Sequence, residues 1–217
     1  MESLVFCKIS CMKYYKGASR HDVPYNGGSF VKENGYGHEE YNFFARNIPD
    51  GWVDDSGSVT GGDYCLGFVE TKSTNASKSN QLHVEKILGF GDRFKTEPCV
   101  TGVTVVWCAT SDLNETQVVG WYKNATVFRE YQTFEDEHGK ERFYNILSLS
   151  SDCTLLPQGT RHRHIWNVPS KKYTRAFGFG QSMLWYAQEE KAMPYLQRLT
   201  DNIRDYYGEN WLYNYPE

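Results

Sequence analysis

Residues 103–109 read Val-Thr-Val-Val-Trp-Cys-Ala, a nearly continuous run of apolar and β-branched side chains. Such a run is typical of a strand that is buried on both of its faces. The polar residues 111–115 have the composition of a tight turn, and a second apolar run at 118–122 follows them. The sequence therefore predicts that residues 103–131 form the central antiparallel hairpin of a sheet.

Segments on both sides of this hairpin have the composition of further strands, and residues 82–90 favour either a strand or a short helix. The expected strands are residues 4–10, 40–44, 64–71 and 143–149. From Pro194 the apolar residues recur every three or four positions, which predicts a helix that stops at Gly208. The expected class is α+β: a strongly curved mixed β-sheet or small barrel with a C-terminal helix. We expect one domain over residues 1–190, followed by a helix in residues 191–217 that packs on it or leads to a further domain.

Two long polar segments, residues 17–40 and 72–80, have the composition of loops. Residues 17–40 are rich in glycine, and residues 72–80 carry two lysines together with several amide and hydroxyl groups. Long loops in a compact domain are often functional. We therefore expect residues 72–80 to face a ligand.

The cysteines and the N-terminus bear on the location of the protein. The six cysteines lie mostly within apolar segments and form no C-x-x-C pair, so we expect them to be reduced and buried. Neither a signal peptide nor an apolar run of membrane-spanning length is present, which predicts a cytoplasmic protein without a membrane partner. A closed zinc site is not expected, because residues 38–40 and 161–164 lack cysteine partners at suitable spacing. No metal or other cofactor is predicted.

The distribution of charge indicates one basic region on an acidic chain. The formal net charge of the 217 residues is -4, so affinity for nucleic acid needs a segregated basic face. No acidic residue lies between Asp152 and Glu189. The cations of this basic stretch are Arg161, Arg163, Lys171, Lys172 and Arg175, with His162 and His164 between them. Lys13 and Lys16, which flank two tyrosines, are further candidates for contacts with a nucleic-acid backbone.

Aromatic side chains make up 16% of the residues, and several of them are candidates for a base-binding pocket. Rings in a sheet usually belong to the core, but rings that converge with a few amides form a slot for a flat nucleobase. The candidate walls are Trp107, Trp121, Tyr122, Trp166 and Trp185, and the candidate edge contacts are Asn75, Asn80 and Asn124. Strand alternation places Trp121 and Tyr122 on opposite faces. Trp121 is the preferred wall, because Gly120 beside it leaves room for a ligand or another backbone.

An alternative interpretation is a magnesium-dependent nuclease. Two acidic residues precede a Glu-Thr-Lys string at the end of an expected strand, as in the metal site of restriction-type nucleases. The candidate residues are Asp50, Asp63, Glu70 and Lys72. The short string is common on solvated strand ends, and the helix that usually follows such a site is missing, since residues 72–80 have the composition of a loop. We therefore prefer a binding protein to an enzyme.

Three strings resemble an N-terminal domain of bacterial modification-dependent restriction systems. They are residues 12–17 (Met-Lys-Tyr-Tyr-Lys-Gly), residues 118–129 (Val-Val-Gly-Trp-Tyr-Lys-Asn-Ala-Thr-Val-Phe-Arg) and residues 180–187 (Gly-Gln-Ser-Met-Leu-Trp-Tyr-Ala). This domain is similar to the PUA-like superfamily, which includes the EVE, YTH and SRA readers of modified bases. The resemblance implies that residues 1–190 form a curved sheet that holds a flipped, modified base between aromatic walls.

The combined expectation is a non-enzymatic reader of a modified nucleobase that targets a restriction or defence system. The expected partner is nucleic acid. Duplex DNA with a methylated or hydroxymethylated base is favoured, and the sequence does not distinguish DNA from RNA. A nuclease or motor subunit or domain is a further expected partner, because the chain itself contains neither a nuclease nor a motor segment of the restriction architecture.

Overall fold

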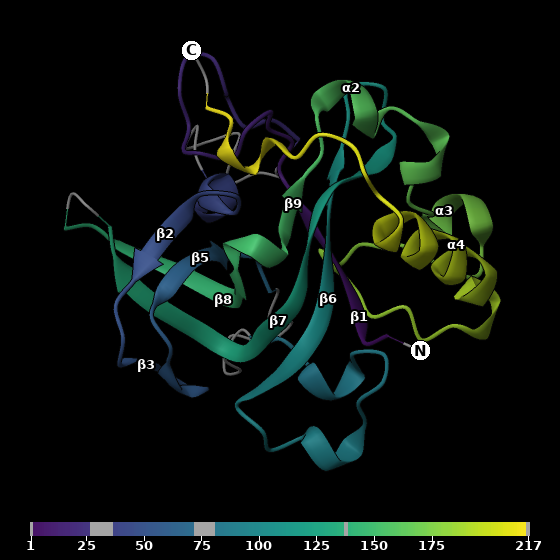
Figure 1. The fold of residues 1–217 in the computed structure, drawn as a ribbon. Helices are drawn as coiled ribbons and strands as arrows, with labels where there is room; N and C mark the ends of the chain where they lie inside the picture. Colours follow the sequence, from purple (N-terminus) through teal and green to yellow (C-terminus); the bar gives the residue numbers. More distant parts are fainter. Residues whose placement is uncertain (1, 27–36, 72–80, 137–138, 216–217) are drawn as a thin grey trace.

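The computed structural model describes residues 2–26, 37–71, 81–136 and 139–215. Within these residues an eight-stranded sheet follows the path β10-β1-β6-β7-β8-β5-β2, and β9 pairs with β7 (Figure 1). The strands of this sheet are β1 (Leu4–Ile9), β2 (Ala45–Ile48), β5 (Gly62–Gly67), β6 (Cys99–Thr110), β7 (Thr116–Glu135), β8 (Glu141–Leu149), β9 (Cys153–Leu155) and β10 (Leu184–Trp185). A separate two-stranded sheet consists of β3 (Trp52–Asp54) and β4 (Gly57–Val59).

The helices are short, apart from α4, and α2, α3 and α4 lie together on one side of the sheet (Figure 1). The α-helices are α2 (Gln158–Arg161), α3 (Lys171–Thr174) and α4 (Met193–Arg204). The 3-10 helices are His38–Tyr41, Val84–Lys86, Asp92–Phe94, Ser150–Asp152, His164–Trp166, Glu190–Ala192 and Trp211–Tyr213.

The sheet is mixed, because β1 runs parallel to β6 while the other neighbouring strands are antiparallel. The expected α+β class with a mixed sheet and a C-terminal helix is therefore confirmed. The strands of the described segments follow an open path and form no closed barrel. The long strand β7 curves along its length, and its register against β8 shifts between Val127 and Gln132 (Figure 1).

The predicted hairpin is present and lies in the middle of the sheet. Its arms are β6 and β7, and the backbone of Ser111 donates to Glu115 across the turn at 2.8 Å. Trp107 and Tyr122 belong to one core cluster, while Trp121 and Trp166 belong to another. This confirms that Trp121 and Tyr122 lie on opposite faces of the sheet.

Two strand predictions need correction, and buried asparagines account for the second. Residues 38–41 form a 3-10 helix instead of a strand that starts at residue 40, and β5 ends at Gly67 instead of continuing to residue 71. The Asn42 side chain donates to the Phe68 carbonyl (3.0 Å) and accepts from the Phe68 amide (2.9 Å). The Asn145 side chain bonds Val69 in the same two ways, at 2.9 and 3.0 Å. These amides satisfy backbone groups that a neighbouring strand would otherwise bond.

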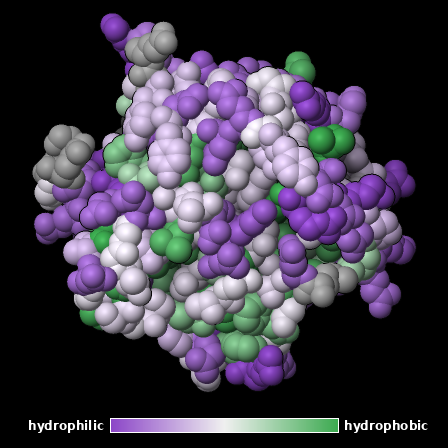
Figure 2. Space-filling model, viewed as in Figure 1, coloured by the Kyte–Doolittle hydropathy of each residue, from purple (hydrophilic) through white to green (hydrophobic). Residues whose placement is uncertain are grey.

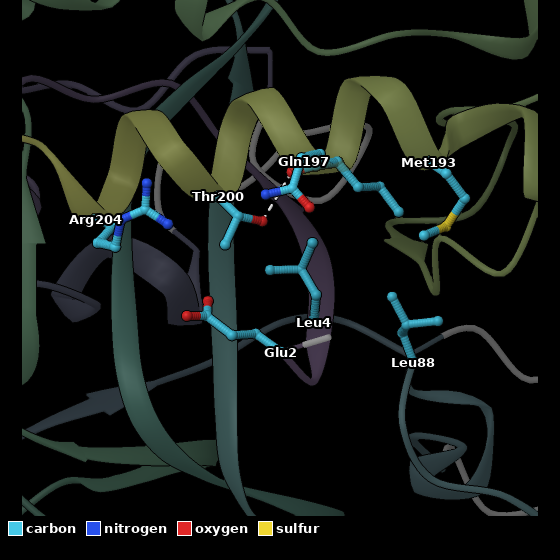
Figure 3. A pocket seen from close by; sticks show the side chains of 8 residues that line it. Glu2, Leu4, Leu88, Met193, Gln197, Thr200 and Arg204 are labelled. Carbon is cyan, nitrogen blue, oxygen red and sulfur yellow. Dashed lines mark hydrogen bonds between the residues drawn. The ribbon is translucent and has the colours of Figure 1, made fainter.

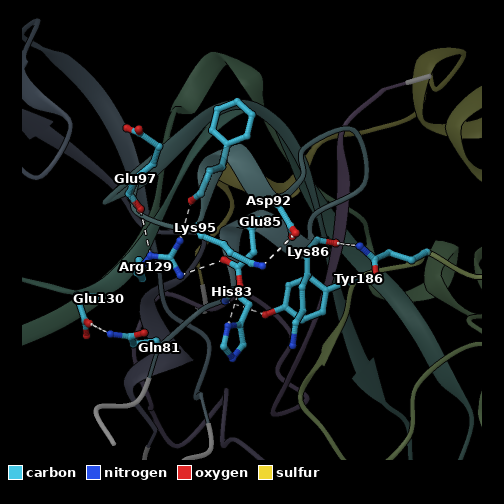
Figure 4. Close-up of polar contacts among 12 residues, drawn as sticks. Gln81, His83, Glu85, Lys86, Asp92, Lys95, Glu97, Arg129, Glu130 and Tyr186 are labelled. Atoms are coloured by element: carbon cyan, nitrogen blue, oxygen red, sulfur yellow. Dashed lines mark hydrogen bonds and ion pairs between the residues drawn. The ribbon is translucent and has the colours of Figure 1, made fainter.

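The segment predicted as a strand or short helix at residues 82–90 contains the 3-10 helix Val84–Lys86, and Arg129 of β7 anchors it. The Arg129 guanidinium contacts the Glu85 carboxylate at 3.0 Å, and both side chains are largely buried. It also donates to the backbone carbonyls of Glu97 (3.0 Å) and Phe94 (2.9 Å) (Figure 4). One arginine therefore ties both ends of residues 85–97 to the sheet.

Helix α4 covers the face of the sheet that carries Trp121. Its buried side chains, Leu196, Leu199 and Ile203, recur at the predicted spacing and pack in the cluster of Leu4 and Trp121. The helix ends at Arg204, before the expected stop at Gly208. A hollow of about 420 Å³ lies along α4. Figure 3 shows the α4 side chains that line this hollow above the side chains of Leu4 and Leu88.

The six cysteines form no disulfide, and Cys7, Cys65, Cys108 and Cys153 are buried while the other two are half-buried. The prediction of free thiols is therefore confirmed, with burial incomplete at Cys11 and Cys99. In the part of the chain that the structure describes, no helix has the length and apolar character needed to span a membrane.

Candidate nucleic-acid interface

The central part of the basic stretch folds into α3, whose two lysines are exposed. Ser170 is the N-cap, and its hydroxyl accepts from the backbone amide of Lys172 at 3.3 Å. Arg175 ends the helix in a left-handed conformation, with a φ of 57°. Lys171, Lys172 and Arg175 are all exposed, so α3 presents three cations on one short helical turn.

Tyr173 lies among these cations and was not among the predicted site residues. Its side chain is 74% exposed, and the Lys172 Nζ lies 5.3 Å from the centre of its ring. An exposed ring between cations is a suitable stacking platform for a base beside a phosphate chain. The run Lys-Lys-Tyr in the sequence was the available signal. We call Lys171, Lys172, Tyr173 and Arg175 the α3 surface; hydrophilic side chains predominate over the region of α3 and α4 in Figure 2.

Arg161, at the start of the basic stretch, has a structural role instead. It is 4% exposed, and its guanidinium donates to the backbone carbonyls of Leu156 (2.9 Å), Met12 (2.6 Å) and Lys13 (2.7 Å). Burial lowers the pKa of Arg161, although nearby phenolic and acidic groups oppose this. The buried Arg161 guanidinium therefore joins α2 to the segment after β1 through these hydrogen bonds. This corrects the expectation that Arg161 contacts a nucleic-acid backbone. Arg163 is exposed, and its contact with a nucleic-acid backbone stays a prediction.

Lys16 is also engaged with the fold. Its ammonium donates to the backbone carbonyls of Phe43 and Leu212, and burial lowers its pKa to about 8. This corrects the expectation of a phosphate contact at Lys16. Lys13 is half-buried, and its Nζ lies 4.7 Å from the ring centre of Tyr14, which stacks on Trp211 at 5.4 Å. Both lysines thus hold the C-terminal segment against the segment after β1.

A hollow of about 510 Å³ adjoins α3, and we call it the Trp185 hollow. The Trp185 Nε1 donates to the Glu189 carboxylate at 2.8 Å, and the Lys171 Nζ pairs with the same carboxylate at 3.0 Å. Burial opposes the ionisation of Glu189, but the bonds from Trp185 and Lys171 outweigh it and lower the pKa of the carboxyl. The hollow is lined by Lys171, Gly178, Gly180, Gln181, Ser182, Leu184, Trp185, Tyr186, Ala187, Gln188 and Glu189. The lining therefore includes Trp185, a predicted wall of the base pocket, and Lys171, a predicted contact with the nucleic-acid backbone.

The other four candidate wall residues lie in the core and are not among the residues that line this hollow. Their exposed fractions are at most 1%, and Trp121 stacks on Trp166 with 5.4 Å between ring centres. A Cβ on Gly120 would lie 2.2 Å from the Thr154 carbonyl oxygen and 2.7 Å from the Phe43 ring. The room beside Gly120 is thus taken by β9 and Phe43, not by an open slot at Trp121. The ring nitrogens of Trp107 and Trp166 and the hydroxyl of Tyr122 are buried without a partner among the described residues.

The predicted edge contacts do not line the Trp185 hollow either. Asn75 and Asn80 lie outside the described residues. Asn124 is exposed on β7, where its φ is 50° and its side chain donates to the Asp152 carboxylate at 3.2 Å. The polar groups that do line the hollow include Gln181, Ser182 and Gln188. Gln181 and Ser182 lie in the string 180–187, but none of the three was among the candidate edge contacts.

The acidic residues of the nuclease alternative take separate positions on the surface. The Asp50 carboxylate accepts from the Gly61 amide at 2.6 Å, and the Asp63 carboxylate accepts from the Asn47 side chain at 3.0 Å. Glu70 is exposed, and Lys72 lies outside the described residues. Across the described segments, no three His, Cys, Asp or Glu side chains gather in a way that could hold a metal ion.

Comparison with known proteins adds no further assignment. No family model, no curated protein and no solved structure matches this chain. The geometry of the α3 surface and of the Trp185 hollow is therefore the basis for assigning a function.

Proposed function

We propose that the protein binds nucleic acid through the α3 surface and reads a modified base in the adjoining Trp185 hollow, without catalysing a reaction. The ligand in this proposal is duplex DNA with a methylated or hydroxymethylated base. The protein would serve as the targeting module of a restriction or defence system, together with a nuclease or motor subunit or domain.

The observation that carries the proposal is the exposed Tyr173 ring among three exposed cations. Cations neutralise phosphates, and exposed rings stack on bases irrespective of their sequence. Each cation that neutralises a phosphate contributes to the salt dependence of binding. Lys172 and Arg175 are the strongest candidates for phosphate contacts, because Lys171 is already paired with Glu189.

The hollow supports the second half of the proposal. Residues 180–187, one of the three strings that resemble modified-base readers, supply most of its lining. Its volume of about 510 Å³ lies within the range of small-ligand sites, and it combines apolar Leu184 and Trp185 with amide and hydroxyl groups. Since Trp185 is only 4% exposed, a base would meet the rim of this ring and the backbone beside it.

A methyl group by itself permits only modest discrimination. Burial of one methyl contributes about 0.8 kcal/mol, which corresponds to a roughly fourfold preference. Stronger selectivity requires polar groups that the unmodified base leaves unpaired. Gln181 and Gln188 are the amides of the lining that could make such contacts.

Binding of labelled duplexes tests the proposal. We expect retention of the duplex, with tighter binding when it carries methylated cytosine, hydroxymethylated cytosine or methylated adenine than when it is unmodified. The titration is run with and without magnesium. Absence of binding to every duplex would contradict the proposal, and magnesium-dependent cleavage would favour the nuclease alternative.

A pair of double variants connects the binding to the α3 surface. Lys172→Glu with Arg175→Gly removes two of its cations, and glycine suits the left-handed backbone at position 175. Lys95→Glu with Arg93→Gly makes the same change of charge on exposed residues around the 3-10 helix Asp92–Phe94. Only the first pair is expected to weaken binding.

A further inference from the structure

A second groove lies between the 3-10 helix His164–Trp166 and α4, and it contains polar groups that the fold does not satisfy. Its volume is about 450 Å³. The hydroxyl of Tyr195 and the side-chain oxygen of Asn167 are buried, and neither has a hydrogen-bond partner among the described residues. The Arg198 guanidinium is exposed and makes no hydrogen bond or ion pair within the described part of the chain.

Unsatisfied buried polar groups are uncommon in folded proteins, because each loses its bonds to water without replacement. The Tyr195 ring is held among other rings, 6.2 Å from Phe6 and 6.0 Å from Trp185. Burial raises the pKa of Tyr195 well above its ordinary value, so the hydroxyl keeps its proton and can donate it in a hydrogen bond. The groove thus offers a fixed donor at Tyr195 and an amide at Asn167.

The groove also has an apolar part and one exposed cation, Arg198. Ile165 is 51% exposed at its rim, and Leu199 is buried beneath it. The only carboxylate of the lining, Asp201, pairs with Arg204 at 2.8 Å and accepts from Gln197 at 3.2 Å. Because Asp201 is engaged in this way, the charge of Arg198 is left for a ligand.

We propose that this groove binds the carboxyl-terminal residue of a peptide from a partner protein, with a branched aliphatic side chain at that position. Arg198 receives the free carboxylate, and Ile165 with Leu199 contacts the aliphatic side chain. The Tyr195 hydroxyl and the Asn167 amide bond the carbonyl and N–H of the last peptide group. Every unsatisfied group of the groove thereby gains a partner from one residue.

Nucleic acid fits the same groove less well, so this inference does not rest on the proposed function. A phosphodiester carries a negative charge for Arg198 but has no apolar group for Ile165. The exposed ring of the lining is the small imidazole of His164, and its Nδ1 already lies 3.4 Å from the side-chain nitrogen of Asn167. Binding at the groove is therefore expected to be independent of binding at the α3 surface.

Small probes test the ligand chemistry on the full chain by chemical-shift titration. N-acetyl-leucine carries the carboxylate, the peptide group and the side chain, and we expect a dissociation constant on the order of 1 mM for a fragment of this size. N-acetyl-leucinamide lacks the carboxylate and N-acetyl-glycine lacks the side chain, and each is expected to bind about tenfold more weakly. Equal binding of the three probes, or no shifts near the groove with N-acetyl-leucine on the order of 10 mM, would overturn the proposal.

A longer probe distinguishes a protein partner from a small metabolite. We expect a tetra-alanyl-leucine peptide with a free carboxyl terminus to bind more tightly than N-acetyl-leucine, because a longer chain contacts more of the groove. If both bind equally, the groove accepts a small carboxylate and the peptide proposal is wrong.

Two variants assign the contacts, with a third as control. Arg198→Ala should weaken N-acetyl-leucine about tenfold and leave N-acetyl-leucinamide unchanged. Tyr195→Phe should weaken both probes without lowering the thermal midpoint, since the hydroxyl has no partner in the free protein. A lower midpoint would show that the hydroxyl supports the fold instead. Lys191→Ala removes a cation outside the groove and should leave binding unchanged.

Discussion

The two ends of the basic stretch use the same residue types for opposite purposes. At the start, Arg161 is buried and holds three backbone carbonyls, and Trp166 shortly after it stacks in the core. At the end, Lys172 and Arg175 are exposed around an exposed tyrosine. A cation or a ring in a sequence therefore indicates a binding surface only when the fold leaves it without buried partners. We therefore expect substitutions at the buried end to lower the stability of the fold, and substitutions at the exposed end to weaken nucleic-acid binding.

Trp166→Ala should have the largest effect on stability. Removal of this fully buried ring is expected to lower the free energy of unfolding by about 3–5 kcal/mol through the cavity it leaves beside Trp121. Urea unfolding measures the loss, and binding is titrated at a temperature at which the variant is still folded. A variant that kept its stability but lost its preference for a modified base would place Trp166 in the binding pocket. The start of the basic stretch would then be functional as well, and its two ends would not differ in role.

Arg161→Gln should follow, with a loss of about 3 kcal/mol in the free energy of unfolding. The carbonyls of Met12, Lys13 and Leu156 would lose charged donors in a buried position. Arg163→Gln is the matched control, because Arg163 is exposed and its loss should change stability by no more than about 0.5 kcal/mol. Equal urea midpoints for the two variants would contradict a structural role for Arg161.

At the exposed end, Tyr173→Ala should affect binding and not stability. Loss of a stacking ring is expected to weaken nucleic-acid binding by about 1–3 kcal/mol, with stability nearly unchanged. Tyr213→Ala serves as a control, since Tyr213 is 61% exposed on the C-terminal segment, away from α3 in the sequence. If both variants bind like the parent protein, Tyr173 does not contact nucleic acid.

The pH dependence of stability should separate Lys16 from the exposed lysines. Burial lowers the pKa of folded Lys16 from 10.5 to about 8, so between these values the unfolded chain binds more protons than the folded one. Stability relative to Lys16→Met should therefore rise by about 1 kcal/mol as the pH increases through this interval, after allowance for solvent screening. Urea unfolding of both proteins at several pH values measures it. A constant difference would show that Lys16 is solvated.

Much of the fold could be predicted, because its main elements have local signals. The apolar run at residues 103–109 and the polar turn after it specify the central hairpin, and the spacing of Leu196, Leu199 and Ile203 specifies α4. The end of β5 could not be predicted, since it depends on side-chain amides of Asn42 and Asn145 that come from distant parts of the chain.

The candidate site was predictable only in outline, because its geometry also depends on contacts between distant parts of the chain. The absence of acidic residues between Asp152 and Glu189 directed attention to Lys171, Lys172 and Arg175, and all three are exposed in the structure. Whether a given cation finds buried carbonyls, as Arg161 does, depends on tertiary contacts that no spacing reveals. Gly120 illustrates the same limit: the sequence indicates a close approach at this position, but not that Thr154 and Phe43 make it.

The salt dependence of duplex binding tests the central claim most directly. For the parent protein, the logarithm of the association constant should fall linearly with the logarithm of salt concentration. Lys172→Glu with Arg175→Gly should reduce this slope by about one to two units, while Lys95→Glu with Arg93→Gly leaves it unchanged. An unchanged slope in the first variant, or an equal reduction in both, would show that the α3 surface does not contact the nucleic-acid backbone.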